Sequence, residues 1–129
     1  MLISNKPSHG LLSVSSQFSL PLASPQPPVL TSNAYSFNAG QCCCAGSRVF
    51  VQESIYDEFL EKLTAKVKSI KVGSPFAADS FQGPATSQLQ YDRVSAHIQS
   101  GVDEGATKHL GGSRHGEEGY FIEPTIFTE

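Results

Sequence analysis

Apolar residues recur at helical spacing in two stretches of the chain. In "SIYDEFLEKLTAKVKSIK" they predict a helix over 55–71, with charged side chains on the opposite, solvated face. Ser54, followed three residues later by Asp57, predicts a capping box at its start, and Gly73 and Pro75 predict its end. The residues predicted to face a core are Ile55, Phe59, Leu63, Val67 and Ile70.

A second helix is predicted to begin at Ser87, with Gln90 in the capping position. Gly105 is well placed to end this helix, because glycine readily adopts the left-handed backbone conformation. Its apolar stripe consists of Leu89, Val94, Ile98 and Val102.

Three shorter stretches have the pattern of extended chain. "RVFVQ" alternates its side chains and predicts a strand, "ATKHL" predicts a second, and Gly111-Gly112 predicts a turn. "GYFIEPTIF" predicts a last extended segment, in which Pro124 favours an edge or irregular strand. Strands that alternate with helices indicate an α/β fold.

The chain changes in composition near residue 36. Residues 1–36 are rich in Ser and Pro, and Lys6 is their only charged side chain. We therefore expect a disordered leader over 1–36 and one folded unit over 37–129. A signal peptide is disfavoured because Ser15 interrupts the apolar core early, and a transit peptide because no arginine precedes Arg48.

Length and charge exclude several classes of protein. A chain of 129 residues is at most one domain. A net charge of -3 without a basic face gives no reason to expect a nucleic-acid partner, and no apolar run is long enough to cross a membrane. Three adjacent cysteines cannot form a disulfide framework, which favours a reducing compartment such as the cytoplasm, with an organelle left open.

All three cysteines stand together in "FNAGQCCCAGSR", and three interpretations compete. They could be small buried apolar residues. A metal site is disfavoured, because adjacent ligands point apart and no C-x-x-C or paired-histidine spacing occurs. A reactive thiolate is the third interpretation, since small neighbours allow close approach and backbone amides can lower the pKa of a thiol.

The surrounding motifs resemble the NAD(P)-dependent aldehyde dehydrogenase family. "FNAGQCCCAGSR" is followed by the strand "VFVQ" and the helix "SIYDEFLEKL", and then by "KVGSPF", "QGP" and "GYFIEPTIF". The resemblance covers residues 37–129 and implies part of a three-layer α/β/α catalytic domain. It also implies that Cys43, two residues after Gln41, is the catalytic nucleophile.

The resemblance implies a reaction as well. The thiolate of Cys43 would attack an aldehyde, with its own backbone N–H as an oxyanion donor. The thiohemiacetal would pass hydride to NAD or NADP, and water would hydrolyse the resulting thioester to a carboxylic acid. Gln41 and Arg48 would shape the loop. The family is homo-oligomeric, and its substrates are small aldehydes.

Several parts that the family uses do not occur in this sequence. An "ELGGK"-type segment that carries the general base, the nucleotide-binding domain and the "EIFGP"-type motif are not found, so no cofactor-binding residue is assigned. The chain alone is therefore expected not to turn over. One alternative is a non-catalytic fragment that associates with full-length subunits through an exposed sheet edge, and another is a thiol redox or metal-binding module.

Overall fold

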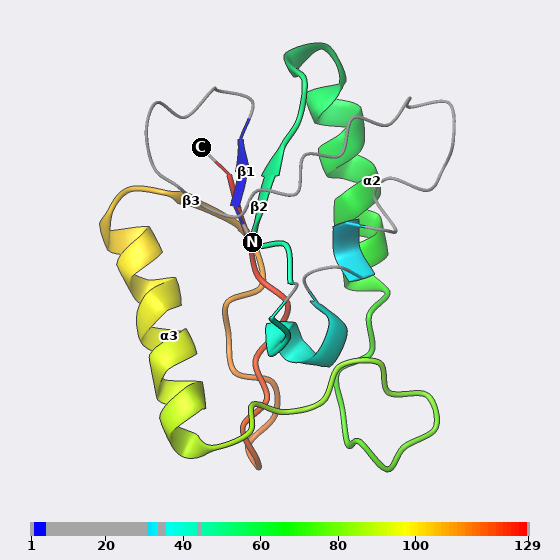
Figure 1. Cartoon of the computed structure of the whole chain (residues 1–129), viewed down its shortest axis with the longest axis vertical. Helices are drawn as coiled ribbons and strands as arrows, with labels where there is room; N and C mark the ends of the chain where they lie inside the picture. The colour runs from blue at the N-terminus through cyan, green and yellow to red at the C-terminus, as the bar shows by residue number, and fades with distance from the viewer. Residues whose placement is uncertain (1, 5–30, 34–35, 44, 129) are drawn as a thin grey trace.

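A computed structural model describes residues 2–4, 31–33, 36–43 and 45–128 (Figure 1). These residues form four short strands and two long helices, with a short helical piece over 31–33 and at Ser36. The strands are β1 (Leu2–Ser4), β2 (Arg48–Phe50), β3 (Thr107–Leu110) and β4 (Ile126–Thr128). The helices are α2 (Tyr56–Lys68) and α3 (Gln88–Asp103), and two tight turns are η1 (Phe37–Gly40) and η2 (Glu53–Ile55).

The four strands form one mixed sheet in the order β2-β1-β4-β3. β1 runs parallel to both β2 and β4, and β3 runs antiparallel to β4. The strands predicted in "RVFVQ" and "ATKHL" are confirmed as β2 and β3. Of the two alternatives predicted for the segment with Pro124, the edge strand is wrong, because β4 begins after this proline and has a neighbour on each side. The irregular alternative agrees with the structure, since residues 123–125 belong to no strand.

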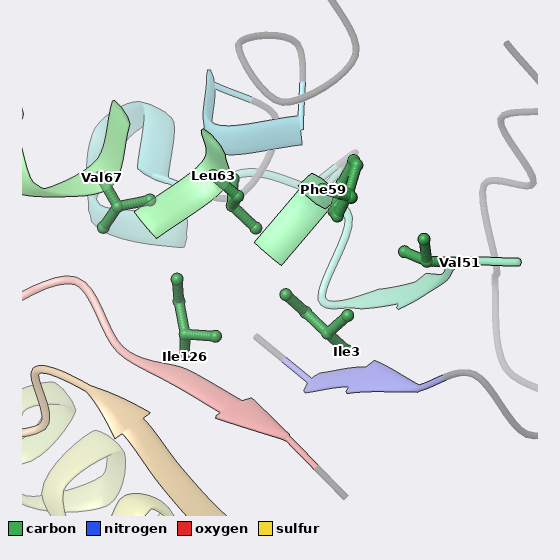
Figure 2. Close-up of a cluster of buried hydrophobic side chains, with 6 residues drawn as sticks. All are labelled: Ile3, Val51, Phe59, Leu63, Val67 and Ile126. Carbon is green, nitrogen blue, oxygen red and sulfur yellow. The ribbon is translucent and has the colours of Figure 1, made fainter. Parts of the chain in front are cut away.

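Helix α2 covers one face of the sheet and makes the core (Figure 2). Phe59, Leu63 and Val67 recur at the predicted spacing and are buried against Ile3 and Ile126. Burial of each large aliphatic or aromatic side chain stabilises the fold by roughly 1.5–3 kcal/mol. The predicted apolar stripe of this helix is therefore confirmed.

The predicted start of α2 is wrong. Ser54 lies inside η2, and α2 begins at Tyr56 with no side-chain hydrogen bond to its cap. The backbone N–H of Ile55 donates to the carbonyl of Gln52 at 3.1 Å, so a short 3-10 turn leads into the helix where the capping box was predicted.

Helix α3 packs on the opposite face of the sheet, which gives three layers (Figure 1). Strand residues alternate between faces, so Ile126 points to α2 while the ring of Phe127 lies against Gly101 of α3. The predicted cap is confirmed, since Ser87 Oγ accepts from the backbone N–H of Gln90 at 3.2 Å. Gly105 follows the helix with φ +92.

The leader predicted over 1–36 is partly ordered. Leu2–Ser4 is a strand, and Ile3 is completely buried, so the prediction of disorder is wrong for these residues. Ser36 is also buried, and its hydroxyl donates a hydrogen bond to the carbonyl of Ser32. The other residues of the leader lie outside the described residues. No helix within the described ranges is long and apolar enough to span a membrane.

Candidate active site

The loop that carries the cysteines begins with an unusual turn. Asn38, Ala39 and Gly40 all have positive φ, of 52, 55 and 74 degrees. Asparagine and glycine adopt this left-handed region readily, whereas an alanine there costs about 1–2 kcal/mol. The backbone N–H of Gln41 closes this turn by donating to the carbonyl of Asn38.

Gln41 fixes this loop to a distant segment. Its side-chain nitrogen donates to the carbonyls of Asn38, at 3.0 Å, and Pro84, at 3.2 Å, while its oxygen accepts from the backbone N–H of Thr86 at 2.8 Å. The backbone N–H of Gln41 also donates to Asn38, at 3.0 Å. The predicted loop-shaping role of Gln41 is confirmed. Its bonds to Pro84 and Thr86 were not predicted, because these residues lie more than 40 positions away in the sequence.

The three cysteines differ in their surroundings. Cys43, the predicted nucleophile, is exposed, whereas Cys42 is half-buried, and neither is in a disulfide. The backbone N–H of Ala45 donates to the carbonyl of Cys42 at 3.0 Å and closes a turn that includes Cys43. Cys44 lies outside the described residues. The structure therefore presents the thiol of Cys43 to solvent on a backbone turn between the Gln41 anchor and β2.

A groove of about 1140 Å³ lies beside this loop, between α3 and the segment that leads into β4. Arg48, predicted to shape the loop, begins β2 and lines the groove. Gln41 and Ala45, on either side of the cysteines, line the groove, whereas Cys43 does not. Other side chains that line it include Gln41, Arg93, His97, Ile98, Ile122 and Phe127.

Gln82, which was not predicted as a site residue, lines the groove. It is buried, and its side-chain nitrogen donates to the carbonyl of Ile122 at 2.8 Å. The backbone carbonyl of Gln82 accepts a hydrogen bond from the backbone N–H of Gly73 at 3.0 Å. This glutamine thus ties the loop after α2 to the segment before β4, and its only signal in the sequence is the "QGP" motif.

The described residues do not fit a dinucleotide or a metal. No pair of glycines in the sequence has the G-x-G spacing that begins a dinucleotide-binding turn. The start of α3, which could receive a phosphate, is already capped by Ser87. Within the described ranges, no three His, Cys, Asp or Glu side chains gather in a way that could hold a metal ion.

Comparison with known sequences identifies relatives of this chain. A sequence model of the aldehyde dehydrogenase family matches residues 30–129, so the match begins upstream of the boundary predicted at Phe37. An aldehyde dehydrogenase of Agaricus bisporus is 60% identical over 99 residues, which are 77% of this chain and 20% of that protein. A mitochondrial benzaldehyde dehydrogenase of Antirrhinum majus is 49% identical over 96 residues, 74% of this chain and 18% of that protein.

Solved structures agree with the sequence comparison. The NAD+ complex of a Bacillus cereus aldehyde dehydrogenase superposes with a TM-score of 0.76 at 37% identity, over 79% of this chain and 21% of that one. An NAD-dependent aldehyde dehydrogenase of Sinorhizobium meliloti gives 0.78 at 33% identity, over 80% of this chain and 20% of that one. The chain thus spans about a fifth of the length of these relatives. By sequence and by fold, it belongs to the aldehyde dehydrogenase family.

Proposed function

We propose that this chain carries the nucleophile of an aldehyde dehydrogenase, and that Cys43 is that nucleophile. The thiolate adds to the carbonyl carbon of a small aldehyde, forming a carbon–sulfur bond, while the carbonyl oxygen takes up the electron pair and then a proton. The product is a thiohemiacetal. The backbone N–H of Cys43 is a suitable donor to the oxygen as it becomes negative.

The observation that carries this proposal is the exposure of Cys43 within an anchored loop. Cys43 is more exposed than Cys42 and stands two residues after Gln41, whose side chain makes three hydrogen bonds. A reactive thiol must be accessible and held in place, and a loop fixed at a neighbouring residue satisfies both needs.

Oxidation of the adduct requires an acceptor for hydride and a base for water. NAD or NADP would be the acceptor, as the NAD+ complex of the Bacillus cereus relative suggests. The described residues offer no fitting site for a dinucleotide. We therefore propose that the 129-residue chain by itself stops at the thiohemiacetal, and that oxidation to the acid takes place only where the rest of the family's fold is supplied.

Alkylation tests the nucleophile. We expect a limiting amount of iodoacetamide to label Cys43 ahead of Cys42 and Cys44, as assigned by fragmentation of the cysteine peptide. An excess of a small aldehyde should slow labelling at Cys43 and leave labelling at Cys42 unchanged. Cys42→Ala is the matched control and should keep the protected site, whereas Cys43→Ala should lose it. Predominant labelling of Cys42 or Cys44 would overturn the assignment.

Turnover is a separate measurement. The purified chain is mixed with a reactive aldehyde and excess NAD+ or NADP+, and the absorbance of the reduced cofactor is followed. We expect no sustained reduction. Reduction over many turnovers that disappears in Cys43→Ala would show that the chain contains a complete active site and would refute the proposed arrest at the adduct.

A second candidate function is association with full-length subunits of the family. The observation that favours it is the exposed face of α3, where no residue is buried and Leu89 remains 60% exposed. The chain would then act as a binding fragment. Size-exclusion chromatography of the chain mixed with a purified full-length relative tests it, since a stable complex is expected and two unshifted peaks contradict it.

A further inference from the structure

The central strand of the sheet comes from outside the part of the chain that matches the family. β1 pairs in parallel with both β2 and β4, whereas the family match starts at residue 30. Neighbouring strands lie about 4.8 Å apart, so β2 and β4 stand about two such spacings from each other. They cannot hydrogen-bond directly. Within the family-matching part, β2 and β4 are therefore separated by a slot one strand wide, which β1 fills.

The two sides of this slot are backbone edges. Leu2, Ile3 and Ser4 stand in register with Arg48, Val49 and Phe50 of β2, and on the other side Leu2 and Ile3 stand in register with Phe127 and Thr128 of β4. An edge left unpaired presents N–H and C=O groups that bind another extended chain readily. A strand in this slot satisfies two edges at once.

On the α2 side of the sheet, the slot is lined by apolar side chains, so it favours an apolar residue at the centre of the strand that fills it. Ile3 is completely buried against the α2 side of the sheet, in one cluster with Phe59, Leu63 and Ile126 (Figure 2). A charged side chain at this position would lose its water without gaining a partner. The slot therefore fits an extended segment with an aliphatic residue at its centre, running parallel to both neighbours.

We propose that the slot between β2 and β4 is a strand-binding site, and that Leu2–Ser4 is the ligand that this chain carries for itself. Recognition follows the rules of strand addition, in which the main chain gives affinity and one side-chain pocket gives selectivity. Because the ligand belongs to the same chain, its effective concentration is high, and the slot stays filled.

Full-length variants test this site with a peptide in trans. Ile3→Asp should prevent the chain's own strand from filling the slot and lower the Tm by roughly 10 °C or more. A fluorescent peptide with the sequence of residues 1–6 should then bind this variant saturably and raise its Tm. The wild-type chain should bind the same peptide at least about tenfold more weakly, because its own strand competes.

Two controls make the result specific. Leu89→Asp places the same acid at an exposed apolar position and should leave both the Tm and the weak peptide binding of the wild type unchanged. A peptide that carries the Ile3→Asp change should bind neither chain. Equal binding of the normal peptide by wild type and Ile3→Asp, or equal binding of both peptides by the variant, would overturn the proposal.

Hydrogen exchange of the wild-type chain provides a measurement that does not depend on a folded variant. If β1 occupies the slot, the amides of Ile3 and Ser4 should be protected to a similar degree as those of β4. Exchange of these two amides at the rate of a free peptide, while β4 remains protected, would also overturn the proposal.

Discussion

Gln41 shows how one amide side chain can anchor the cysteine loop. It donates to two carbonyls and accepts from one N–H, which uses both its donor and its acceptor character. A carboxylate of nearly the same shape could still accept from Thr86, but it would place negative charge beside the carbonyls of Asn38 and Pro84.

Gln41→Glu should therefore loosen the cysteine loop. Each lost hydrogen bond is worth about 1 kcal/mol, which corresponds to roughly a fivefold change in the population of the closed loop. We expect the preference of iodoacetamide for Cys43 over Cys42 to fall, because the half-buried Cys42 becomes accessible. Gln52→Glu, at an exposed glutamine, is the matched control. An unchanged labelling ratio in Gln41→Glu would show that other contacts hold the loop.

Gly111 occupies a position where any other residue would be strained. Its φ is +69, and a Cβ there would lie 2.0 Å from the carbonyl oxygen of Pro124. We expect Gly111→Ala to lower the free energy of unfolding by about 2 kcal/mol or more. Gly83→Ala should have little effect, because a Cβ at Gly83 meets no atom within 4 Å. Urea denaturation of the two variants checks the difference, and equal midpoints would contradict it.

At the scale of elements, the sequence predicted what depends on local spacing. The apolar stripe of α2 and the Ser87 cap of α3 were predicted because residues three or four apart share a helix face or a turn. The sheet order was not, because pairing joins segments that are distant in the sequence. Leu2–Ser4 offered only three residues of pattern within a Ser- and Pro-rich stretch, which is too short to distinguish from random alternation.

In the candidate site, too, features set by neighbouring residues were predicted, and features set by distant contacts were not. Cys43 was assigned through a motif of neighbouring residues, and its assignment remains a prediction. The positive φ of Asn38 and Ala39 and the hydrogen bonds from Gln41 to Pro84 and Thr86 depend on tertiary contacts. A single sequence does not reveal such contacts when the residues involved have ordinary propensities.

The loop that follows α2 is closed by an ion pair. Lys71 pairs with Asp79, and the Lys71 carbonyl accepts from the backbone N–H groups of Phe81, at 2.9 Å, and Gln82, at 3.1 Å. The hydrogen bond from Lys71, together with its charge, lowers the pKa of Asp79 below its ordinary value of 3.8. A lowered carboxyl pKa stabilises the folded loop above pH 3.8, and this contribution is lost as the pH falls through the lowered value.

We expect Lys71→Ala to raise the pKa of Asp79 toward its ordinary value, because the hydrogen bond and the charge of Lys71 are lost. An NMR titration of the carboxyl carbon measures this directly. Lys62→Ala removes a lysine that pairs with Glu58 on α2, and it should leave the Asp79 titration unchanged. Because the Lys71–Asp79 pair is exposed, its effect on global stability should be small. An Asp79 pKa that does not rise in Lys71→Ala would show that the pair does not form in solution.

At the scale of the whole molecule, the two faces of the sheet are covered unequally. The α2 face carries the buried cluster, whereas α3 has no buried residue and the groove beside it remains open. Phe50 of β2, which alternates with the inward-facing Val49 and Val51, is 39% exposed. Exposed apolar side chains such as Phe50 and Leu89 favour self-association.

Leu89→Glu should reduce this self-association without destabilising the fold. Leu89 lies in the first turn of α3, where an acid is favourable to the helix dipole. We expect lower light scattering at equal protein concentration and an unchanged Tm. Gln52→Glu adds the same charge at an exposed polar site and should scatter light as the wild type does. If Gln52→Glu lowered the light scattering as much as Leu89→Glu does, the added negative charge, and not the loss of the apolar Leu89 side chain, would explain the reduced self-association.

The pairing of Leu2 with Phe127 also bears on how quickly the molecule can form. This ladder joins residues from opposite ends of the sequence, and closing so long a loop sacrifices much of the freedom of the unfolded chain. Helices α2 and α3 need only nearby residues and can appear early, whereas chains rich in sequence-distant pairs fold slowly. We expect the refolding rate to be limited by the meeting of β1 and β4 at the centre of the sheet.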